Sequence, residues 1–279
     1  MTVPRFERSY ELAIGIDGQV LIVRPPFRIA FDAVKSIFGG VNRLNVKVWN
    51  LKSENRLKVV KDAEDAEYIP VSLKVGYGQS LETVFKGSIH RGAVSRQAPD
   101  TLVMLECLDG GRDFLFSFSS QTVSAKAPAI DQLIANFPNL VKGRVTNFTP
   151  GTRPKVLFGN TAELIRNSLA PDETFYIDDE EVYIIKADEY TREAIPLVNS
   201  GTGLMATPER KNKRVTFQTL LNPVIKIGAR VQLESITAGY LNGVYRVEDI
   251  SYKGDYEGAD WSQVITGTLS AGFRSVRDD

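Results

Sequence analysis

Few residues in this chain of 279 residues are of the types that carry out catalysis. His90 is the only histidine, and a Ser-His-Asp or Cys-His device would depend on it, because histidine is the usual base that activates a weak nucleophile. The sequence has no Gly-x-Ser-x-Gly pattern, and one histidine cannot form a multi-histidine metal site. His90 follows Phe85-Lys86-Gly87-Ser88-Ile89, read as a strand, and precedes Arg91-Gly92, so we expect a surface residue at the end of a strand.

Cys107 is the only cysteine, which excludes an intrachain disulfide, a thiolate metal site and an iron–sulfur cluster. Its neighbours Leu105 and Leu108 are apolar, which is typical of a buried structural thiol rather than a reactive one. We therefore expect Cys107 to lie in a hydrophobic core.

Carboxylates are plentiful, and a pair of them can hydrolyse a glycosidic bond whatever their spacing in the sequence. The densest group is Asp178-Asp179-Glu180-Glu181, which lies between two apolar runs and lacks the spaced ligands and turn glycine of a calcium-binding loop. We expect a solvated hairpin turn there, and a second solvated loop at Asp255, Glu257 and Asp260. A cell-wall glycosidase that uses paired carboxylates stays open as an alternative function.

Two glycine pairs and one basic group complete the candidates. Gly39-Gly40 and Gly110-Gly111 do not belong to a Walker or dinucleotide-binding pattern, so both are expected to form turns. No aromatic residues alternate with the basic group, which suits a solvated loop or a protein partner better than nucleic acid. Its members are Arg210, Lys211, Lys213 and Arg214. The sequence thus predicts a protein that is not an enzyme, with no catalytic residue, no metal site and no cofactor.

The charge balance also restricts the function. Lys plus Arg and Asp plus Glu each number 34, so the formal net charge is zero. A nucleic-acid coat protein or a polybasic membrane-surface protein needs an excess of positive charge. The first residues lack the apolar core of a signal peptide, and no stretch is apolar enough to span a membrane. We expect a protein that folds in a cytosol, without a membrane partner or sequence-specific binding to nucleic acid.

The elements that must position these residues fall into three regions. Residues 1–126 are rich in period-two patterns, which predict strands over 12–16, 20–23, 43–50, 71–75 and 102–107. The first two strands are expected to form a hairpin through Asp17-Gly18, and the last is expected to be covered on both sides. Phe114, Phe116 and Phe118 are expected on one face of a further strand. One solvated helix is expected from Ser53, with the (i, i+4) ion pairs Glu54–Lys58, Lys58–Asp62 and Lys61–Asp65.

Residues 127–194 favour a small α+β module. Its first helix is predicted by the helical spacing of Ile130, Leu133, Ile134 and Phe137, and it ends at Pro138. Asn160 with Glu163 indicates the start of a second helix. Apolar runs on either side of the acidic residues 178–181 favour a β-hairpin.

Residues 195–279 return to strand patterns, at 214–220, 224–227, 230–235, 243–252 and 261–269. The alternation changes phase between Val247 and Ile250, which indicates a β-bulge, and residues 201–211 favour a polar loop that is mobile before assembly. The chain is thus predicted to be mainly β. Two β-barrel-like ends, residues 1–126 and 195–279, flank the α+β insert of residues 127–194.

The order of motifs along the chain resembles that of tailed-bacteriophage baseplate hub (tail-tip hub) proteins and their late-control relatives. The C-terminal motifs are Asn222-Pro223, Lys226-Ile227-Gly228, Asn242-Gly243-Val244-Tyr245-Arg246-Val247, Tyr252 with Gly254-Asp255, and Trp261 with Ile265 and Gly267. The earlier motifs are Pro25-Pro26-Phe27-Arg28-Ile29, Gly39-Gly40, residues 44–51 and residues 153–160. Their chemistry agrees with a turn at Gly228, a tight hairpin at Asn242-Gly243 and a buried Trp261.

The resemblance implies a structural role. Proteins of this family form a trimeric ring at the distal end of the tail tube. Two barrel-like tube domains in each subunit give six similar units, which lets the ring join a sixfold tube to a threefold spike while DNA passes during ejection. The implied partners are two further copies of the chain, the tail tube protein, a separate central spike protein and other baseplate or tape-measure proteins.

The implied location is the tail baseplate of the virion, after assembly in the host cytoplasm. A carbohydrate-binding tail adhesin is a further alternative, because aromatic residues such as Trp49 or Tyr240 would suit sugar binding if they were exposed.

Overall fold

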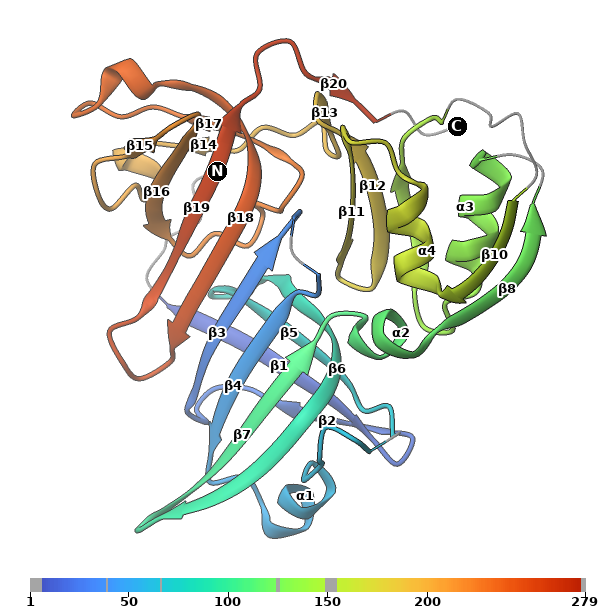
Figure 1. The fold of residues 1–279 in the computed structure, drawn as a ribbon. Helices are drawn as coiled ribbons and strands as arrows, with labels where there is room; N and C mark the ends of the chain where they lie inside the picture. The colour runs from blue at the N-terminus through green and yellow to red at the C-terminus, as the bar shows by residue number, and fades with distance from the viewer. Residues whose placement is uncertain (1–6, 39, 66, 124–125, 149–154, 277–279) are drawn as a thin grey trace.

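A computed structural model describes residues 7–38, 40–65, 67–123, 126–148 and 155–276 (Figure 1). The N-terminal strands are β1 (Arg8–Ile16), β2 (Gln19–Val23), β3 (Ile29–Ser36), β4 (Arg43–Trp49), β5 (Pro70–Tyr77), β6 (Ser80–Gln97) and β7 (Asp100–Leu108), with the helix α1 (Ser53–Lys58) after β4. β1 and β2 form the predicted hairpin. Asp17 (φ 49°) and Gly18 (φ 75°) are both left-handed, as a type I′ turn requires.

The middle of the chain has a small core of its own. Its elements are α2 (Gly111–Phe116), β8 (Phe118–Val123), α3 (Lys126–Ala135), β9 (Val141–Val145), β10 (Lys155–Asn160), α4 (Thr161–Ser168), β11 (Glu173–Asp178), β12 (Glu181–Lys186) and β13 (Glu189–Tyr190). β8 pairs with β10, and β12 lies between β11 and β9. Ile130 of α3, Ile165 of α4 and Ile184 of β12 belong to one buried cluster, so the helices join the two small sheets. Asn160 caps α4 as predicted, because its side chain accepts the N–H of Glu163.

The C-terminal part returns to strands. Its elements are β14 (Leu197–Val198), the 3₁₀ turn η1 (Ser200–Thr202), β15 (Glu209–Lys211), β16 (Arg214–Leu220), β17 (Arg230–Leu233), the 3₁₀ turn η2 (Gly239–Leu241), β18 (Gly243–Asp255), β19 (Trp261–Leu269) and β20 (Arg274–Ser275). β18 shows the predicted bulge, since its register against β19 shifts between Val247 and Asp249.

A single sheet joins the two β-rich ends. Its strand order is β15-β16-β19-β18-β3-β4-β7-β6-β5-β1-β2, so β18 pairs directly with β3 (Figure 1). Trp261 is buried as predicted and packs edge-on against Phe31 of β3, with ring centroids 5.7 Å apart. The mainly β fold with an α+β insert is confirmed. The described strands form an open sheet rather than a closed barrel, because β15 and β2 stay at the two ends of the order.

Three expectations for the N-terminal region are wrong. Residues 111–116 form the helix α2, so Phe114 and Phe116 are helical and only Phe118 begins a strand. The helix α1 ends at Lys58, before the expected ion pairs with later residues can form, and Lys58 pairs with Asp17 instead (2.9 Å). β7 is covered on one side only, because Met104 and Glu106 are exposed.

Two expectations for the C-terminal region also fail. Residues 224–227 form part of a loop before β17 rather than a strand. Asn242 ends η2 and its side chain accepts the N–H of Ser235 (2.7 Å), so a longer connection than a tight hairpin links β17 to β18. Residues 224–227 bond to distant parts of the chain, since Tyr252 donates to the carbonyl oxygen of Ile225, whereas Asn242 is held by the local contact with Ser235. Within the described ranges, no helix combines the length and the apolarity that crossing a membrane would require.

Gly228 lies where the C-terminal part meets the middle of the chain, and only glycine fits there. Its φ is 72°, and a Cβ would overlap the Tyr176 hydroxyl oxygen. Tyr176 cannot move aside, since it is buried and stacks on Tyr183 with centroids 5.1 Å apart. We predict that Gly228→Ala lowers the free energy of unfolding by about 3 kcal/mol, from backbone strain and overpacking together, as measured by denaturant unfolding.

Gly272→Ala is the matched control. Gly272 also has a left-handed φ (83°), but a Cβ there meets no atom within 4 Å. This variant should lose only about 1 kcal/mol, the backbone cost alone. Equal losses in the two variants would contradict the crowding at Gly228.

Candidate functional site

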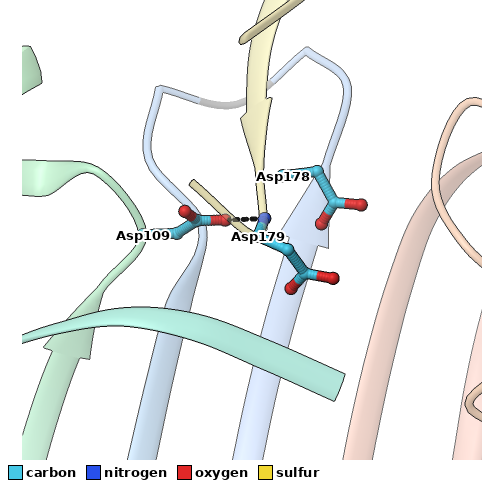
Figure 2. A group of neighbouring side chains, drawn as sticks. All are labelled: Asp109, Asp178 and Asp179. Atoms are coloured by element: carbon cyan, nitrogen blue, oxygen red, sulfur yellow. Dashed lines mark hydrogen bonds between the residues drawn. The ribbon is translucent and has the colours of Figure 1, made fainter. Parts of the chain in front are cut away.

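The most unusual site in the described structure is a group of buried charges where three parts of the chain meet. We call it the junction cluster; its members are Lys35 of β3, Asp109 after β7, Asp178 and Asp179 at the β11–β12 turn, and Lys226 in the loop before β17. Figure 2 shows its three carboxylates around the turn. Lys35 belongs to the N-terminal part, the turn to the middle and Lys226 to the C-terminal part. The cluster therefore links all three.

The two ammonium groups lie between the carboxylates. Lys35 Nζ donates to Asp178 Oδ1 (2.5 Å) and Asp179 Oδ1 (2.7 Å), and its side chain has no exposed surface. Lys226 Nζ donates to Asp179 Oδ2 (2.9 Å) and to the carbonyl oxygen of Thr83 in β6. Both oxygens of Asp179 are thus paired, one by each lysine. A buried charge is tolerated when it is paired and hydrogen-bonded in this way.

Asp109 holds the backbone of the turn. Its two carboxylate oxygens accept the N–H groups of Asp179 (2.7 Å) and Glu180 (2.8 Å), the first of which is drawn in Figure 2. Both turn residues have left-handed φ angles, 56° and 66°, which non-glycine residues rarely adopt. The contact with Asp109 therefore compensates a turn conformation that is unfavourable on its own.

Further contacts hold the middle of the chain on both sides. Asn42 donates to the carbonyl oxygen of Ile177 (2.7 Å), and Tyr68 donates to the Glu180 carboxylate. On the C-terminal side, the guanidinium of buried Arg246 donates to the carbonyl oxygens of Lys186 (3.2 Å), Ala187 (2.9 Å) and Glu189 (3.1 Å). The β11–β12 hairpin is thus anchored at its turn by the N-terminal sheet and at its open end by β18.

Burial and charge shift the protonation of the cluster. Burial raises the pKa of Asp109 to about 8, against the opposing effect of Lys35. Burial alone would lower the pKa of Lys35, but the Asp178 and Asp179 carboxylates outweigh it and the pKa is raised. Burial alone would raise the pKa of Asp179, but Lys35 and Lys226 outweigh it and the pKa is lowered. With Asp109 protonated, two lysines balance two carboxylates and the cluster is neutral.

The three carboxylates are of the type that binds a divalent cation, and their oxygens lie within 4.8 Å of one another. The lysine ammonium groups, however, lie at hydrogen-bond distance from two of the three carboxylates. The arrangement therefore suits a structural ion network rather than a metal site.

The expectation of a solvated turn at residues 178–181 is wrong. Asp178 is buried, and Asp179, Glu180 and Glu181 are each partly buried. One signal in the sequence does indicate that Lys35 needs a buried carboxylate partner. Ile29, Phe31, Ala33 and Lys35 all lie on the inward face of β3, so Lys35 is a charge on an apolar face and requires a buried carboxylate.

The two residues with nucleophile or base chemistry, Cys107 and His90, lie on the paired strands β7 and β6, and neither belongs to the junction cluster. Cys107 is buried as predicted, and burial raises the pKa of its thiol, so it is not a reactive thiolate. His90 is half-buried in the middle of β6, beside a register shift between Ile89 and Arg91, and not at a strand end as expected. The long β6 continues past this bulge because β7 pairs with it on both sides of the shift.

The other predicted sites have structural explanations. Asp255 is partly buried, and its carboxylate accepts hydrogen bonds from Arg28 (2.9 Å) and from the N–H groups of Glu257 and Gly258. These contacts lower the pKa of Asp255 and outweigh burial, which alone would raise it. Glu257 and Asp260 are exposed as expected. Gly110, with a left-handed φ of 61°, turns the chain into α2. Gly39 lies outside the described residues.

The expected surface groups are mostly exposed. All four members of the basic group lie on the β15–β16 hairpin, and Arg214 pairs with Glu248 (2.9 Å). Trp49 is half-buried beneath the Arg28 guanidinium, 4.4 Å from its ring centroid, whereas Tyr240 is 83% exposed. These residues do not converge with the junction cluster.

The raised pKa of Asp109 predicts a pH dependence of stability. Between about pH 5 and pH 8 the folded state keeps a proton on Asp109 that the unfolded state has released, so the free energy of unfolding falls as the pH rises, by roughly 1 kcal/mol per pH unit. Asp109→Asn carries no titrating group and should remove this slope in denaturant unfolding over the same range.

Asp32→Asn, on the exposed face of β3, is the control and should keep the slope of the original chain. Asp109→Asn with an unchanged slope, whatever its absolute stability, would contradict the assignment of the proton to Asp109.

Comparison with known proteins identifies the fold. Among curated proteins, none matches the sequence. Among solved structures, the chain is similar to a 43 kDa tail protein of prophage MuSo2 from Shewanella oneidensis (TM-score 0.65, 11% identity, 95% of this chain and 99% of that chain). It is also similar to a tail protein from Neisseria meningitidis MC58 (TM-score 0.60, 10% identity, 95% and 99%) and to an E. coli component of the type VI secretion system (TM-score 0.62, 8% identity, 92% and 76%).

At these identities the solved structures establish a shared fold over nearly the whole chain. The family itself is established by sequence, because a family model described as baseplate hub gp41 matches residues 11–256. The chain therefore belongs to the baseplate hub gp41 family.

Proposed function

We propose that this chain is the structural baseplate hub of a phage tail, a homotrimeric ring that joins the sixfold tail tube to the threefold central spike and lets DNA pass on ejection. Membership of the baseplate hub family gives the chain a structural role at the tail tip of the virion. The ring, its three copies and its passage for DNA are the proposed part.

The observation that carries the proposal is the single sheet through both ends of the chain (Figure 1). The pairing of β18 with β3 makes the N-terminal strands β1–β7 and the C-terminal strands β14–β19 parts of one sheet. Three copies arranged in a ring then supply six β-rich units, which suits a sixfold tube on one side and a threefold spike on the other. The sheet stays open at both ends of its strand order, which leaves edge strands that could pair between copies in a head-to-tail ring.

The exposed face of this sheet suits the wall of a DNA channel. Lys253 of β18 lies opposite Asp32 of β3, and on the adjoining strands Glu106 of β7 lies opposite Arg91 of β6. Asn45 of β4 connects the two pairs in register, and all five side chains are exposed. The two positive charges, at the ends of this row, cancel the two negative charges between them. Because an excess of lysine and arginine is what binds phosphate, such a face would let DNA slide without holding it.

The partners follow from this arrangement. They are the two other copies, the tail tube protein, a central spike protein and other baseplate or tape-measure proteins, with assembly in the host cytoplasm. A subunit enclosed by other proteins is served well by its zero net charge. The proposal includes no catalysis, since the carboxylates that the junction cluster brings together are buried beside lysines and cannot reach a polysaccharide.

Mass photometry and negative-stain electron microscopy of the purified chain test the proposal. We expect particles with three times the mass of one chain and a central opening, formed by the chain alone or after addition of the spike and tube proteins. A chain that stays monomeric with both partners present would contradict the ring. Release of sugars from peptidoglycan, abolished by a single Asp or Glu substitution, would favour the glycosidase, and saturable glycan binding would favour the adhesin.

A further inference from the structure

The basic group lies at one end of the main sheet, on the β15–β16 hairpin, where β15 is the last strand of the order. All of its side chains are exposed. Arg214 is ion-paired with β18, but the described residues place no carboxylate oxygen within 4.0 Å of Arg210, Lys211 or Lys213. Glu209 is the one carboxylate on β15 itself, so the hairpin keeps an excess of positive charge.

The hairpin holds these charges in a fixed arrangement. Lys211 of β15 lies opposite Arg214 of β16, and the Arg210 Nε closes the turn by donating to the carbonyl oxygen of Asn212 (2.9 Å). β16 pairs with β19 over residues 214–220. A charged surface that is already ordered loses little conformational entropy when it binds, which favours its use in a contact.

The strands also end at the outer half of β6. β5 pairs with β6 only as far as Ser88, and residues 91–97 of β6 pair with β7 on one side. On the other side the described residues add a single bridge, from Lys61 to Gly92. The chain continues from Lys61 into four acidic residues, which therefore start beside this edge of β6. We call them the acidic segment; its members are Asp62, Glu64, Asp65 and Glu67.

The acidic segment carries the opposite charge. All four of its side chains are exposed, and within the described ranges no lysine or arginine nitrogen lies within 4.0 Å of their carboxylates. Lys61 and Arg112 line one cavity with three of the four. The Lys61 ammonium is buried and donates to backbone carbonyl oxygens. The carboxylates outnumber these cations, so the segment keeps an excess of negative charge.

The two surfaces are the strongest concentrations of each charge on the outside of the chain. The hairpin has four Lys or Arg within six residues, and the acidic segment has four Asp or Glu within six. A second acidic group of this density, residues 178–181, belongs to the turn of the junction cluster. Figure 1 shows the β15–β16 hairpin and the segment after α1 well apart, so they do not meet within one chain.

Each charged surface adjoins exposed apolar side chains. Phe38 is 51% exposed and lies beneath the Arg214 guanidinium, which is 5.1 Å from its ring centroid. Leu115 and Phe116 of α2 are 49% and 72% exposed and line the same cavity as Glu64. Apolar area bordered by charge is the usual composition of a contact between proteins.

We propose that the basic β15–β16 hairpin of one copy binds the acidic segment of the next copy, in three identical head-to-tail contacts. This inference rests on the proposed ring and identifies the two surfaces that form it. A head-to-tail contact requires two unlike, complementary surfaces on every copy, and a threefold rotation repeats it until the ring closes. Single exposed ion pairs add little affinity, but a group of them selects the partner surface and speeds association.

Charge reversal on either surface tests the contact. The double variants Lys211→Glu with Lys213→Glu, and Asp62→Lys with Glu64→Lys, each replace attraction between copies by repulsion. None of these four side chains makes a hydrogen bond or ion pair in the part of the chain that the structure describes, so both variants should fold, as circular dichroism and thermal unfolding check. Sedimentation velocity, with spike and tube proteins present, should show a trimer at least about tenfold weaker in each variant.

The variant with all four substitutions separates this contact from other effects of charge. It restores opposite charges on the two surfaces, so it should recover most of the lost affinity. Lys142→Glu with Arg274→Glu is the control, because it changes the net charge as much as the hairpin variant does, at exposed positions outside both surfaces. The control should form the trimer as the original chain does.

The outcomes distinguish the contact from the ring. An original chain that stays monomeric with both partners present would contradict the ring and this inference with it. A trimeric original chain whose two double variants are equally trimeric would overturn this inference alone and leave the ring standing. A folded variant with all four substitutions that stays monomeric, beside a trimeric original chain, would mean that the hairpin binds the spike or tube protein instead, and would also overturn it.

Discussion

The structure depends on burying the charged β11–β12 turn at the junction of three parts of the chain. Two aspartates cannot leave water unless cations replace the lost hydration, and Lys35 and Lys226 do so from two different parts. A buried ion pair adds little net stability compared with apolar packing, but a buried charge that has lost its partner is strongly destabilising. The cluster therefore acts mainly through specificity, because any arrangement that separates the three parts leaves a buried charge unpaired.

The other features of the fold agree with this constraint. The pairing of β18 with β3 joins the two β-rich ends, and Arg246 and Gly228 hold the middle of the chain against the C-terminal end. A hub between a tube and a spike would carry load through all three parts, so a subunit that keeps one arrangement suits the proposed role. The whole chain has a formal net charge of zero. The junction cluster is also neutral once Asp109 is protonated, because two lysines then face two ionised aspartates.

Local patterns predicted those elements whose hydrogen bonds are local. The bounds of β16 and β19, the Asp17-Gly18 hairpin and the Asn160 cap agree with the structure. The patterns failed where contacts with residues far away in the sequence determine the local conformation or the burial. Phe114 and Phe116, which alternate with Phe118 in the sequence, lie in a helix that follows the turn at Gly110. Asp178 of the acidic turn is buried because it pairs with Lys35, which is 143 residues away in the sequence. The pairing of β3 with β18 has no local signal, whereas a lysine on the apolar face of β3 was visible in the sequence.

Hydrogen exchange, followed peptide by peptide in the original chain, in Lys35→Met and in the surface control Lys253→Met, tests the central claim most directly. The account predicts that β11–β12, β3 and β18 open with the same free energy in the original chain and in the control, since no part can leave while the cluster is paired. In Lys35→Met, which leaves the buried Asp178 carboxylate without its ammonium partner and Asp179 with Lys226 alone, β11–β12 should open at a lower free energy than β4 and β7. A β11–β12 hairpin that already opens separately in the original chain, or an unchanged pattern in Lys35→Met, would contradict the account.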